Sequence, residues 1–311
     1  MAIHFPYGTA LQGLSERRLR YFYATVQAGS MRQAADQLDV EQSVISRQIQ
    51  QLEVDLNTTL FERRGNRLKP TEAAWVVMAY VKERLEKEEA LIGALCDLNQ
   101  ARRGRIKLVS GEGFVPELII HTLHDFCQAS PHIEIALDVM NMNELVRHVV
   151  EDRAHIGLAY GITVPAEIEV LAERLEPVCV SVAADHPLAN HSGPIALQAL
   201  LPYRVGVMPP GFGFRQMVDA AELNEQVKFT PGLVTSSVMA LRQFARMGLG
   251  VSFMRERDMA EELASGQCVA LRTQNPVFES AKAQLIVRRN RLLPTSVQDL
   301  LQALIGSSMY R

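Results

Sequence analysis

The chain has 311 residues, of which 48% are hydrophobic and 22% are charged, so it can bury sizeable cores and should form more than one domain. Its longest apolar runs fall far short of the roughly 18 residues of a membrane span, and its N-terminus lacks the basic-then-apolar layout of a signal peptide. These properties exclude a membrane-spanning protein and predict a soluble protein of the cytoplasm.

The net charge of −3 is unevenly distributed. Residues 1–70 contain nine Lys and Arg against seven Asp and Glu, a net charge of +2, whereas the remainder contains 23 against 28, a net charge of −5. Only the first segment therefore suits a polyanion, although so small an excess does not by itself identify a nucleic-acid-binding protein.

The four cysteines are scattered, and none lies in a CxxC pair or beside histidines at metal-binding spacing. This distribution argues against a metal site or a thioredoxin-like centre, and no metal or cofactor is expected. Buried free thiols are the favoured interpretation, with redox sensing by two distant cysteines as the alternative, for Cys96, Cys127, Cys179 and Cys268.

Two short helices are predicted within residues 15–38. Ser15 is a favourable N-cap for the first, Gly29 can end it in a left-handed conformation, and Ser30 can cap the second. The apolar positions of the first helix follow the spacing i, i+3, i+4, i+7, at Leu19, Phe22, Tyr23 and Val26. One face of the second helix carries Met31, Ala34, Ala35 and Leu38, and its alanines would let a third helix approach closely.

The third helix is apolar on one side only. At about 100° per residue, its apolar side chains form a stripe about 60° wide, made of Ile45, Ile49, Leu52 and Leu56. The opposite side carries groups that donate to base edges and phosphates, namely Ser43, Arg47 and Gln50, with Ser46 at the edge; Gln42, at the start of the helix, is a further candidate for DNA binding. This pattern is typical of the recognition helix of a helix-turn-helix, which predicts a DNA-binding protein.

A basic hairpin is predicted directly after this helix. Gly65-Asn66 can form a tight turn between two short arms. Its basic residues, together with Arg32 of the second helix, would contact phosphates or the minor groove, and they are Arg63, Arg64, Arg67 and Lys69. The alternative is a solvated basic loop without a ligand.

One long helix is predicted from Thr71 to about Leu98. The four-three heptad spacing is broken only by Glu88 and runs through Ala74, Met78, Val81, Leu85, Ile92 and either Leu95 or Cys96. An apolar seam on a helix beside a DNA-binding unit predicts dimerisation. The alternative is burial of the seam against the helix's own chain.

From Arg105 onward, strand-like and helical segments alternate, which predicts an α/β region with parallel sheets. The strand-like segments are RIKLVSG, IEIALDVM, HIGLAYG, PVCVSVAA, YRVGVM, GVSFM and AQLIVRR. Helices are predicted at 116–129, 143–150, 214–223, 236–247 and 296–305.

The segment LRYFYATVQAGSMRQAADQLDVEQSVISRQIQQLEVDLNTTLFERRGNRLKPTEAA resembles the DNA-binding domain of LysR-type transcriptional regulators. The resemblance continues more loosely over the rest of the chain, for example at residues 186–189 and 245–254. Asn57 and Ala74 stand where the family usually has Gly; Asn tolerates the left-handed backbone and Ala suits a helix. His155 replaces a usual acidic residue, and a structural role is favoured over a pH-responsive one.

The resemblance implies a multidomain protein: an N-terminal all-α winged helix-turn-helix, a linker helix, and a C-terminal α/β region of two lobes like type 2 periplasmic binding proteins. Residues 1–13 would form an N-terminal extension, 14–70 the DNA-binding domain, 71–99 the dimerisation helix, 100–104 a hinge and 105–311 the effector-binding domain. Crossings near Glu176-Pro177 and Asn275-Pro276 would divide it into lobe 1 (105–176 and 277–311) and lobe 2 (177–276).

A small-molecule effector is expected between the lobes, with an organic anion as the default because helix-start N–H groups favour negative charge. Candidate effector-binding residues come from strand ends and helix starts. They are Ser110, Gly111, Phe114, Met142 and Tyr160 in lobe 1, and Met208, Phe212, Thr235, Ser236, Ser237 and Phe253 in lobe 2.

The resemblance also implies partners: double-stranded DNA carrying an inverted repeat, a second copy of the chain through the linker helix, and a tetramer of such dimers. RNA polymerase is a further candidate partner.

Two other functions compete. An enzyme is disfavoured because the chain lacks GxSxG, GxxxxGK[ST], HExxH and a GxGxxG after a strand. A periplasmic-type solute-binding protein is disfavoured by the helix-turn-helix and by the missing signal peptide.

Overall fold

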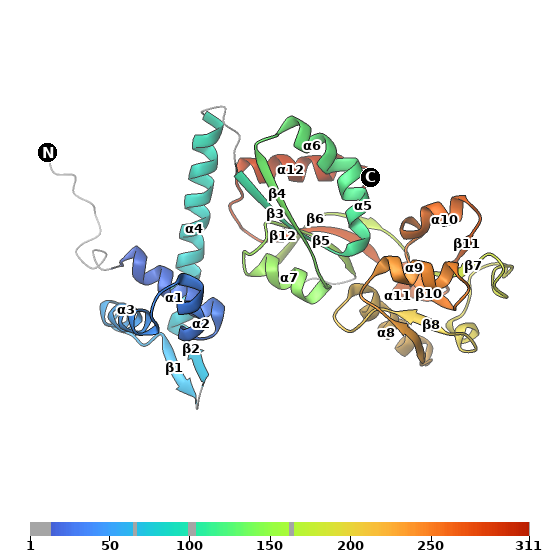
Figure 1. Cartoon of the computed structure of the whole chain (residues 1–311), viewed down its shortest axis with the longest axis horizontal. Coiled ribbons are helices and arrows are strands. Elements are labelled where there is room, and N and C mark those ends of the chain that lie inside the picture. The colour runs from blue at the N-terminus through green and yellow to red at the C-terminus, as the bar shows by residue number, and fades with distance from the viewer. Residues whose placement is uncertain (1–13, 65–66, 99–103, 162–164, 311) are drawn as a thin grey trace. The chain divides into compact units, whose positions relative to one another are not determined.

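The computed structural model describes residues 14–64, 67–98, 104–161 and 165–310, and it divides the chain into two compact units, Met1–Glu89 and Ala90–Arg311 (Figure 1). Each unit has hydrophobic clusters of its own. The first unit contains α1 (Glu16–Ala28), α2 (Met31–Leu38), α3 (Gln42–Asp55), β1 (Phe61–Arg64), β2 (Arg67–Pro70) and the start of α4 (Glu72–Leu98).

The boundaries of the first helices follow the predicted capping residues. Gly29 ends α1 with φ +70°, and the Ser30 hydroxyl accepts a hydrogen bond from the Gln33 amide at 3.1 Å at the start of α2. Ser15 occupies the N-cap position of α1, but its side chain makes no capping hydrogen bond. Asn57 adopts φ +49°, so the turn after α3 keeps the left-handed backbone expected at that position.

Two hydrophobic clusters hold the first unit together. Tyr21 of α1 packs in one cluster with Ala34 and Ala35 of α2 and with Ile45 and Ile49 of α3. The two alanines are fully buried or nearly so, which allows the close approach of α3. The other cluster joins α1, α3 and α4 through Leu19, Phe22, Leu52, Leu60, Ala74, Met78 and Val81.

The apolar seam of α4 is divided between two environments. Ala74, Met78 and Val81 are buried against α1 and α3, so the first half of the seam serves the helix's own chain. Leu85 and Ile92, in the second half, are exposed by 46% and 62%. The prediction of one continuous dimer seam is therefore wrong for its first half, because the winged unit needs those residues to close its core.

Glu53 connects α3 to the hairpin. Its carboxylate accepts hydrogen bonds from the backbone amides of Leu60 at 2.7 Å and Phe61 at 3.2 Å. Leu60 directly precedes β1 and Phe61 begins it, and β1 pairs with β2 in antiparallel register from Phe61–Pro70 to Arg64–Arg67. The predicted hairpin is present, whereas its Gly65-Asn66 turn lies outside the described residues.

The second unit contains two five-stranded sheets, each defining a lobe (Figure 1). Lobe 1 has the strand order β4-β3-β5-β12-β6. Its elements are β3 (Gly104–Ser110), η2 (Glu112–Phe114), α5 (Val115–Leu118), the π-helical η3 (Ile119–Leu123), α6 (His124–Ala129), β4 (Ile133–Val139), α7 (Met142–Val150), β5 (Ile156–Gly161), β6 (Ile168–Leu175), β12 (Lys282–Arg288) and α12 (Thr295–Gly306).

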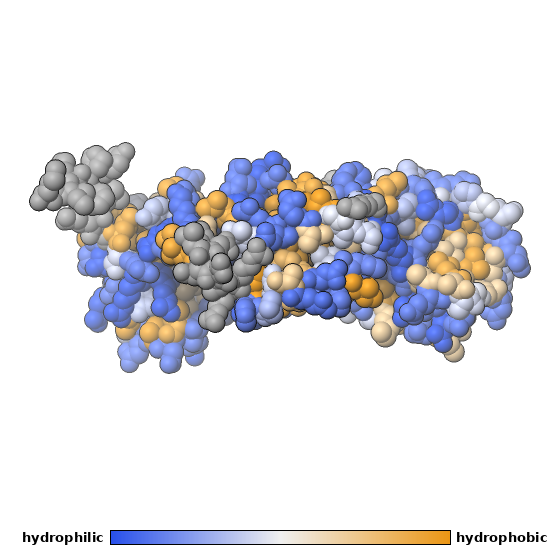
Figure 2. Space-filling view, turned by 90° about the horizontal axis from the view of Figure 1, so that it is seen from above, coloured by the Kyte–Doolittle hydropathy of each residue, from blue (hydrophilic) through white to orange (hydrophobic). Residues whose placement is uncertain are grey.

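Lobe 2 has the strand order β11-β7-β10-β8-β9. Its elements are β7 (Cys179–Ala183), η4 (Leu197–Leu200), β8 (Val205–Val207), α8 (Gly213–Glu225), β9 (Pro231–Val234), α9 (Val238–Arg246), β10 (Val251–Met254), η5 (Glu256–Met259), α10 (Ala260–Ala264), β11 (Cys268–Leu271) and α11 (Pro276–Glu279). On the face shown in Figure 2, apolar residues lie in patches among hydrophilic ones. The exposed apolar side chains of lobe 2 include Met239, Met247 and Leu249.

Both sheets are mixed and not wholly parallel as predicted. β3 runs parallel to β4 and β5, but β12 is antiparallel to β5 and β6. In lobe 2, β10 and β9 run parallel to β8, but β7 is antiparallel to β10 and β11. The strands that reverse direction, β7 and β12, are those by which the chain enters each lobe from the other. Alternation of strands and helices within a lobe could not reveal this reversal.

The two segments that connect the lobes lie side by side. Glu176 donates its amide to the carbonyl of Ala281 at 2.8 Å, and the Val178 amide donates to the carbonyl of Phe278 at 3.0 Å. The first segment joins β6 to β7, and the second joins α11 to β12. Gly104, which the sequence placed in a hinge, instead begins β3 and pairs with Ile133 in the parallel ladder.

Replacing Glu53 by Ala should destabilise the first unit by about 1–3 kcal/mol, because two backbone amides at the start of β1 lose their acceptor. Glu53→Gln keeps an acceptor oxygen and should lose less. Trp75, the single tryptophan, lies on α4 and reports unfolding of this unit by its fluorescence. Urea midpoints that do not fall in Glu53→Ala would contradict this role.

Candidate DNA-binding surface and interlobe cleft

The outer face of α3 presents the polar side chains predicted to read DNA. Gln42, Ser43, Arg47 and Gln50 are exposed and Ser46 is half-buried, whereas the opposite face of the helix, with Ile45, Ile49 and Leu52, is buried. The helix therefore has the predicted orientation within its unit. Its polar side chains are held on a fixed scaffold by three fully buried neighbours.

These side chains have few partners inside the unit. Ser43 donates its hydroxyl to Glu41 at 3.2 Å. Within the described part of the chain, Arg47 makes no ion pair, and Arg32 on α2 is exposed. An exposed guanidinium without an internal carboxylate can form bidentate bonds to a base or a phosphate.

The hairpin places basic residues beside α3 in the sequence, with Arg64 directly opposite Arg67 in the ladder. Lys69 of β2 is exposed. The side chains of Arg63, Arg64 and Arg67 lie outside the described part of the structure. Their assignment to the phosphate backbone therefore stays a prediction from the sequence.

A small cavity of about 50 Å³ lies between the lobes of the second unit. Six predicted effector residues line it, from both lobes: Gly111, Phe114, Met142, Tyr160, Met208 and Phe212. Most of the remaining wall is apolar and includes Met140, Leu145, Leu158, Phe214 and Val238. A cavity of this size has room for a few waters and is well below the roughly 300–1,000 Å³ of a typical ligand pocket.

The other five predicted effector residues do not line this cavity. Phe253 belongs to the core of lobe 2, where its ring lies 5.7 Å from that of Phe229 and 5.3 Å from that of Phe278. Ser110 is fully buried and donates to the Gly111 carbonyl at 2.9 Å. Thr235, Ser236 and Ser237 precede α9, where Ser237 caps the helix by accepting from the Ala240 amide at 3.3 Å.

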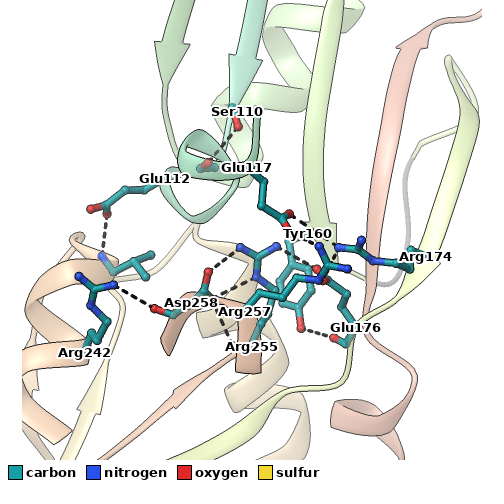
Figure 3. Close-up of polar contacts among 12 residues, drawn as sticks. Ser110, Glu112, Glu117, Tyr160, Arg174, Glu176, Arg242, Arg255, Arg257 and Asp258 are labelled. Carbon is teal, nitrogen blue, oxygen red and sulfur yellow. Dashed lines mark hydrogen bonds and ion pairs between the residues drawn. The ribbon is translucent and has the colours of Figure 1, made fainter. Parts of the chain in front are cut away.

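The N-terminus of α9 is already occupied by a carboxylate from lobe 1. Glu112 accepts a hydrogen bond from the Val238 amide at 2.6 Å and another from the Ser237 hydroxyl at 3.2 Å. Figure 3 shows the Glu112 side chain reaching across to this helix start. The sequence suggested that the N–H groups at this helix start bind an anionic effector. In the structure they bind a carboxylate of the protein itself, that of Glu112.

Arg255 is the other charged residue of the cavity wall, and it is only 2% exposed. Its guanidinium bonds Glu176 at 2.9 Å and Asp258 at 2.5 Å (Figure 3). It also lies over the rings of Phe114 and Tyr160, 4.6 and 5.4 Å from their centroids. Burial opposes its charge, but the two carboxylates outweigh burial and raise the pKa of Arg255. For Tyr160, by contrast, burial itself raises the pKa of the phenol, whose hydroxyl donates to the Glu176 carbonyl.

Further charges surround Glu176 and complete a compensated cluster. Arg257 bonds Glu176 at 3.1 Å and also contacts Glu117, and Arg174 bonds Glu176 as well (Figure 3). The cluster thus contains three arginines and three acids, counting Arg255 and Asp258. None of these arginines is left without an internal carboxylate to attract an anion from solution.

Two glycines allow the lobes to approach closely. A Cβ on Gly113 of lobe 1 would come within 2.6–2.7 Å of Arg255 and Asp258 side-chain atoms. A Cβ on Gly213 of lobe 2 would lie 2.1 Å from the Tyr160 carbonyl oxygen, so only glycine fits there. Gln216 also donates to Asn143 across the cleft at 3.0 Å. The lobes are therefore closed on each other.

Sequence reasoning missed Glu112, Glu176 and Arg255 as cleft residues. Arg255 directly follows β10, and the rule that selected strand ends could have found it. Glu112 lies two residues beyond β3, where a glutamate reads as an ordinary solvated residue. Its role depends on a helix that begins more than 120 residues later in the chain.

The described cysteines are free thiols: Cys127 is exposed, and Cys179 and Cys268 are buried. Burial raises the pKa of the Cys179 thiol to about 12, and it also raises the pKa of Cys268. Both thiols therefore stay protonated at neutral pH, which disfavours reaction with oxidants. Cys96 lies in α4, but its side chain is outside the described part.

His155 has a structural position, with 2% of its surface exposed. Its Nδ1 accepts a hydrogen bond from the Lys107 amide at 3.0 Å, which links the start of β5 to β3.

Among the described residues, no group of three or more His, Cys, Asp or Glu side chains could hold a metal ion. None of the described helices combines the length and the apolar character needed to cross a membrane.

Two family models match the chain in sequence. Residues 17–75 match the bacterial regulatory helix-turn-helix protein, lysR family, and residues 99–307 match the LysR substrate binding domain. The chain is 28% identical to the uncharacterised HTH-type transcriptional regulator YeiE of Escherichia coli K12, over 80% of this chain and 83% of that protein. It is also 28% identical to the RuBisCO operon transcriptional regulator of Allochromatium vinosum, over 83% and 85% of the two chains.

Solved structures show the same fold over most of the chain. A full-length OxyR variant from Pseudomonas aeruginosa superposes with a TM-score of 0.67 at 20% identity, covering 96% of this chain and 97% of that one. CbnR in complex with its target DNA gives a TM-score of 0.51 at 20% identity, covering 93% and 98%. With a winged helix-turn-helix followed by a two-lobed α/β domain, the chain belongs to the LysR family and is a DNA-binding transcriptional regulator with an effector-binding domain.

Proposed function

We propose that the protein binds an inverted-repeat DNA site as a homodimer, with α3 of each copy in the major groove. The observation that carries this proposal is the outer face of α3, where Ser43, Arg47 and Gln50 are exposed on a helix whose other face is fully buried. Ser46 and Gln42 flank this face and would contact the same groove. Arg32 and the arginines of the hairpin would bind phosphates, which position the protein without reading sequence.

Dimerisation would use the part of α4 that its own unit leaves uncovered. Val76 and Tyr80 of α4 are exposed by 72% and 46%, although both are large and apolar. Further along the helix, Leu91 and Leu95 are exposed as well. Exposed apolar residues at successive helical turns fit a second copy of the same helix, which gives the two-fold symmetry that an inverted repeat requires. A tetramer would be assembled from such dimers.

Effector binding would occur in the cleft between the lobes, where the small cavity is lined by both of them. An effector would shift the balance between closed and open lobes, and this shift would rearrange the DNA-bound dimers. RNA polymerase is the partner through which a change on DNA would reach transcription. We assign no catalytic activity to the cleft, and we place the protein in the cytoplasm, where its DNA target lies.

The substitution Arg47→Ala should weaken binding to a selected operator duplex by about 1–3 kcal/mol, because a guanidinium that reads a base is lost. Arg20→Ala, on α1, removes the same charge from another exposed position and is the matched control. Affinity is measured by fluorescence anisotropy with operators selected from random duplexes, and circular dichroism checks the fold. Equal affinity of Arg47→Ala and wild type would refute the orientation assigned to α3.

The double substitution Val76→Asp and Tyr80→Asp should convert the dimer into monomers, because charge would be buried without a partner at the helix interface. Light scattering after size-exclusion chromatography measures the mass directly. Val54→Asp serves as the control, since Val54 is 70% exposed but lies on α3. A double variant that keeps the wild-type mass would exclude this face of α4 from the dimer.

A ligand of the cleft should raise the melting temperature of the full-length protein. Stabilisation is about 2.7 kcal/mol at a ligand concentration about 100-fold above its dissociation constant. A thermal-shift screen of small metabolites detects such a ligand, and Met208→Trp, which fills the cavity, should abolish its effect. A hit that is unaffected by Met208→Trp binds elsewhere and would argue against this cleft.

A further inference from the structure

Glu112 separates two hollow spaces between the lobes. On one side is the inner cavity of about 50 Å³, and on the other is an open groove of about 370 Å³. Glu112, Gly113 and Val238 line both of them. The contact between Glu112 and the start of α9 is therefore the wall between the cavity and the groove.

The bonding of Glu112 is that expected of a bound carboxylate ligand. One oxygen accepts from a helix-start amide at 2.6 Å, and the other accepts from the hydroxyl of the N-cap serine at 3.2 Å. Helix α9 has nine residues, and its positive N-terminal end favours negative charge at this point. The two partners lie 125 and 126 residues from Glu112 in the chain and belong to the opposite lobe.

We propose that Glu112 is a tethered carboxylate that fills the anion-binding position of the cleft, latches lobe 1 to α9 and determines that an effector meeting this helix start is not an anion. Tethering gives Glu112 an effective concentration in the millimolar range or above, so a free carboxylate at lower concentration does not displace it. An anion that reached the inner cavity would also find Arg255 already bonded to Glu176 and Asp258.

This inference rests on the proposed function only in taking the cleft as the effector site. It concerns the chemical class of the ligand and the contact that keeps the lobes closed. Its test needs neither DNA nor effector, so its failure would leave the proposed reading of DNA by α3 untouched.

Glu112→Ala in the full-length protein provides the test by chemical rescue. Loss of two charge-assisted hydrogen bonds should lower the melting temperature of the second unit by about 3–8 °C. Sodium acetate at about 100 mM should restore much of this loss in the variant by occupying the vacated position, where the Val238 amide and the Ser237 hydroxyl have lost their acceptor. The melting temperature of the wild type in sodium acetate should lie within about 1 °C of its melting temperature in sodium chloride. The two salts are compared at the same ionic strength, so that charge screening is the same in both. Acetamide has nearly the same shape but no charge and should restore little.

Glu134→Ala is the matched control, because Glu134 is an exposed glutamate of the same lobe that pairs only with Arg105 in the described structure. It should show no acetate-specific gain. Equal responses of wild type and Glu112→Ala to acetate, or no loss of melting temperature in Glu112→Ala, would overturn the proposal.

Hydrogen exchange gives a second measurement that does not depend on the melting temperature. In the wild type, the Val238 amide is hydrogen-bonded to Glu112. Glu112→Ala should speed exchange of the peptide that begins α9 by at least about tenfold, and Glu112→Gln, which keeps an uncharged acceptor, should speed it less. Unchanged exchange in both variants would show that the latch does not form in solution.

Discussion

The buried guanidinium of Arg255 ties the two lobes together at the point where the chain passes between them. Asp258 anchors it within lobe 2, while Glu176 belongs to the connecting segment and the Phe114 and Tyr160 rings come from lobe 1. A charge this deeply buried is tolerated only while its partners stay in place, since an unpaired ion in the interior costs several kcal/mol. The arrangement of the lobes therefore depends on Arg255 keeping its ion pairs with both Glu176 and Asp258.

Around that contact, the charged and polar groups of the cleft are paired with other groups of the protein. The start of α9 is neutralised by Glu112, and the arginines near Glu176 all have internal carboxylates. Behind Glu112, the inner space between the lobes is a small, mostly apolar cavity whose lining includes methionines and aromatic rings. Flexible methionine side chains can repack around ligands of different shape, so this lining is compatible with a small ligand of modest polarity.

Helix α4 has two roles: some of its residues complete the core of the first unit, and others remain exposed. Its first turns complete the core with α1 and α3, which fixes the direction in which α3 presents Arg47. The apolar residues that this core leaves exposed, Val76 and Tyr80 among them, are available to a second copy. A partner packed on that face would thus set the separation of the two recognition helices, because each α3 is rigidly joined to its own α4.

The amino-acid sequence by itself determined the elements whose signals are local. The orientation of α3 followed from the spacing of Ile45, Ile49 and Leu52, and the end of α1 from the conformational freedom of Gly29. Only the tertiary structure decided which residues of distant elements contact one another. The first half of the α4 seam was taken up by its own unit, β7 and β12 reversed direction on crossing between lobes, and Glu112 found its amide partner 126 residues away. Periodicity and capping act over a few residues, whereas burial and hydrogen bonding across lobes depend on contacts that no local pattern encodes.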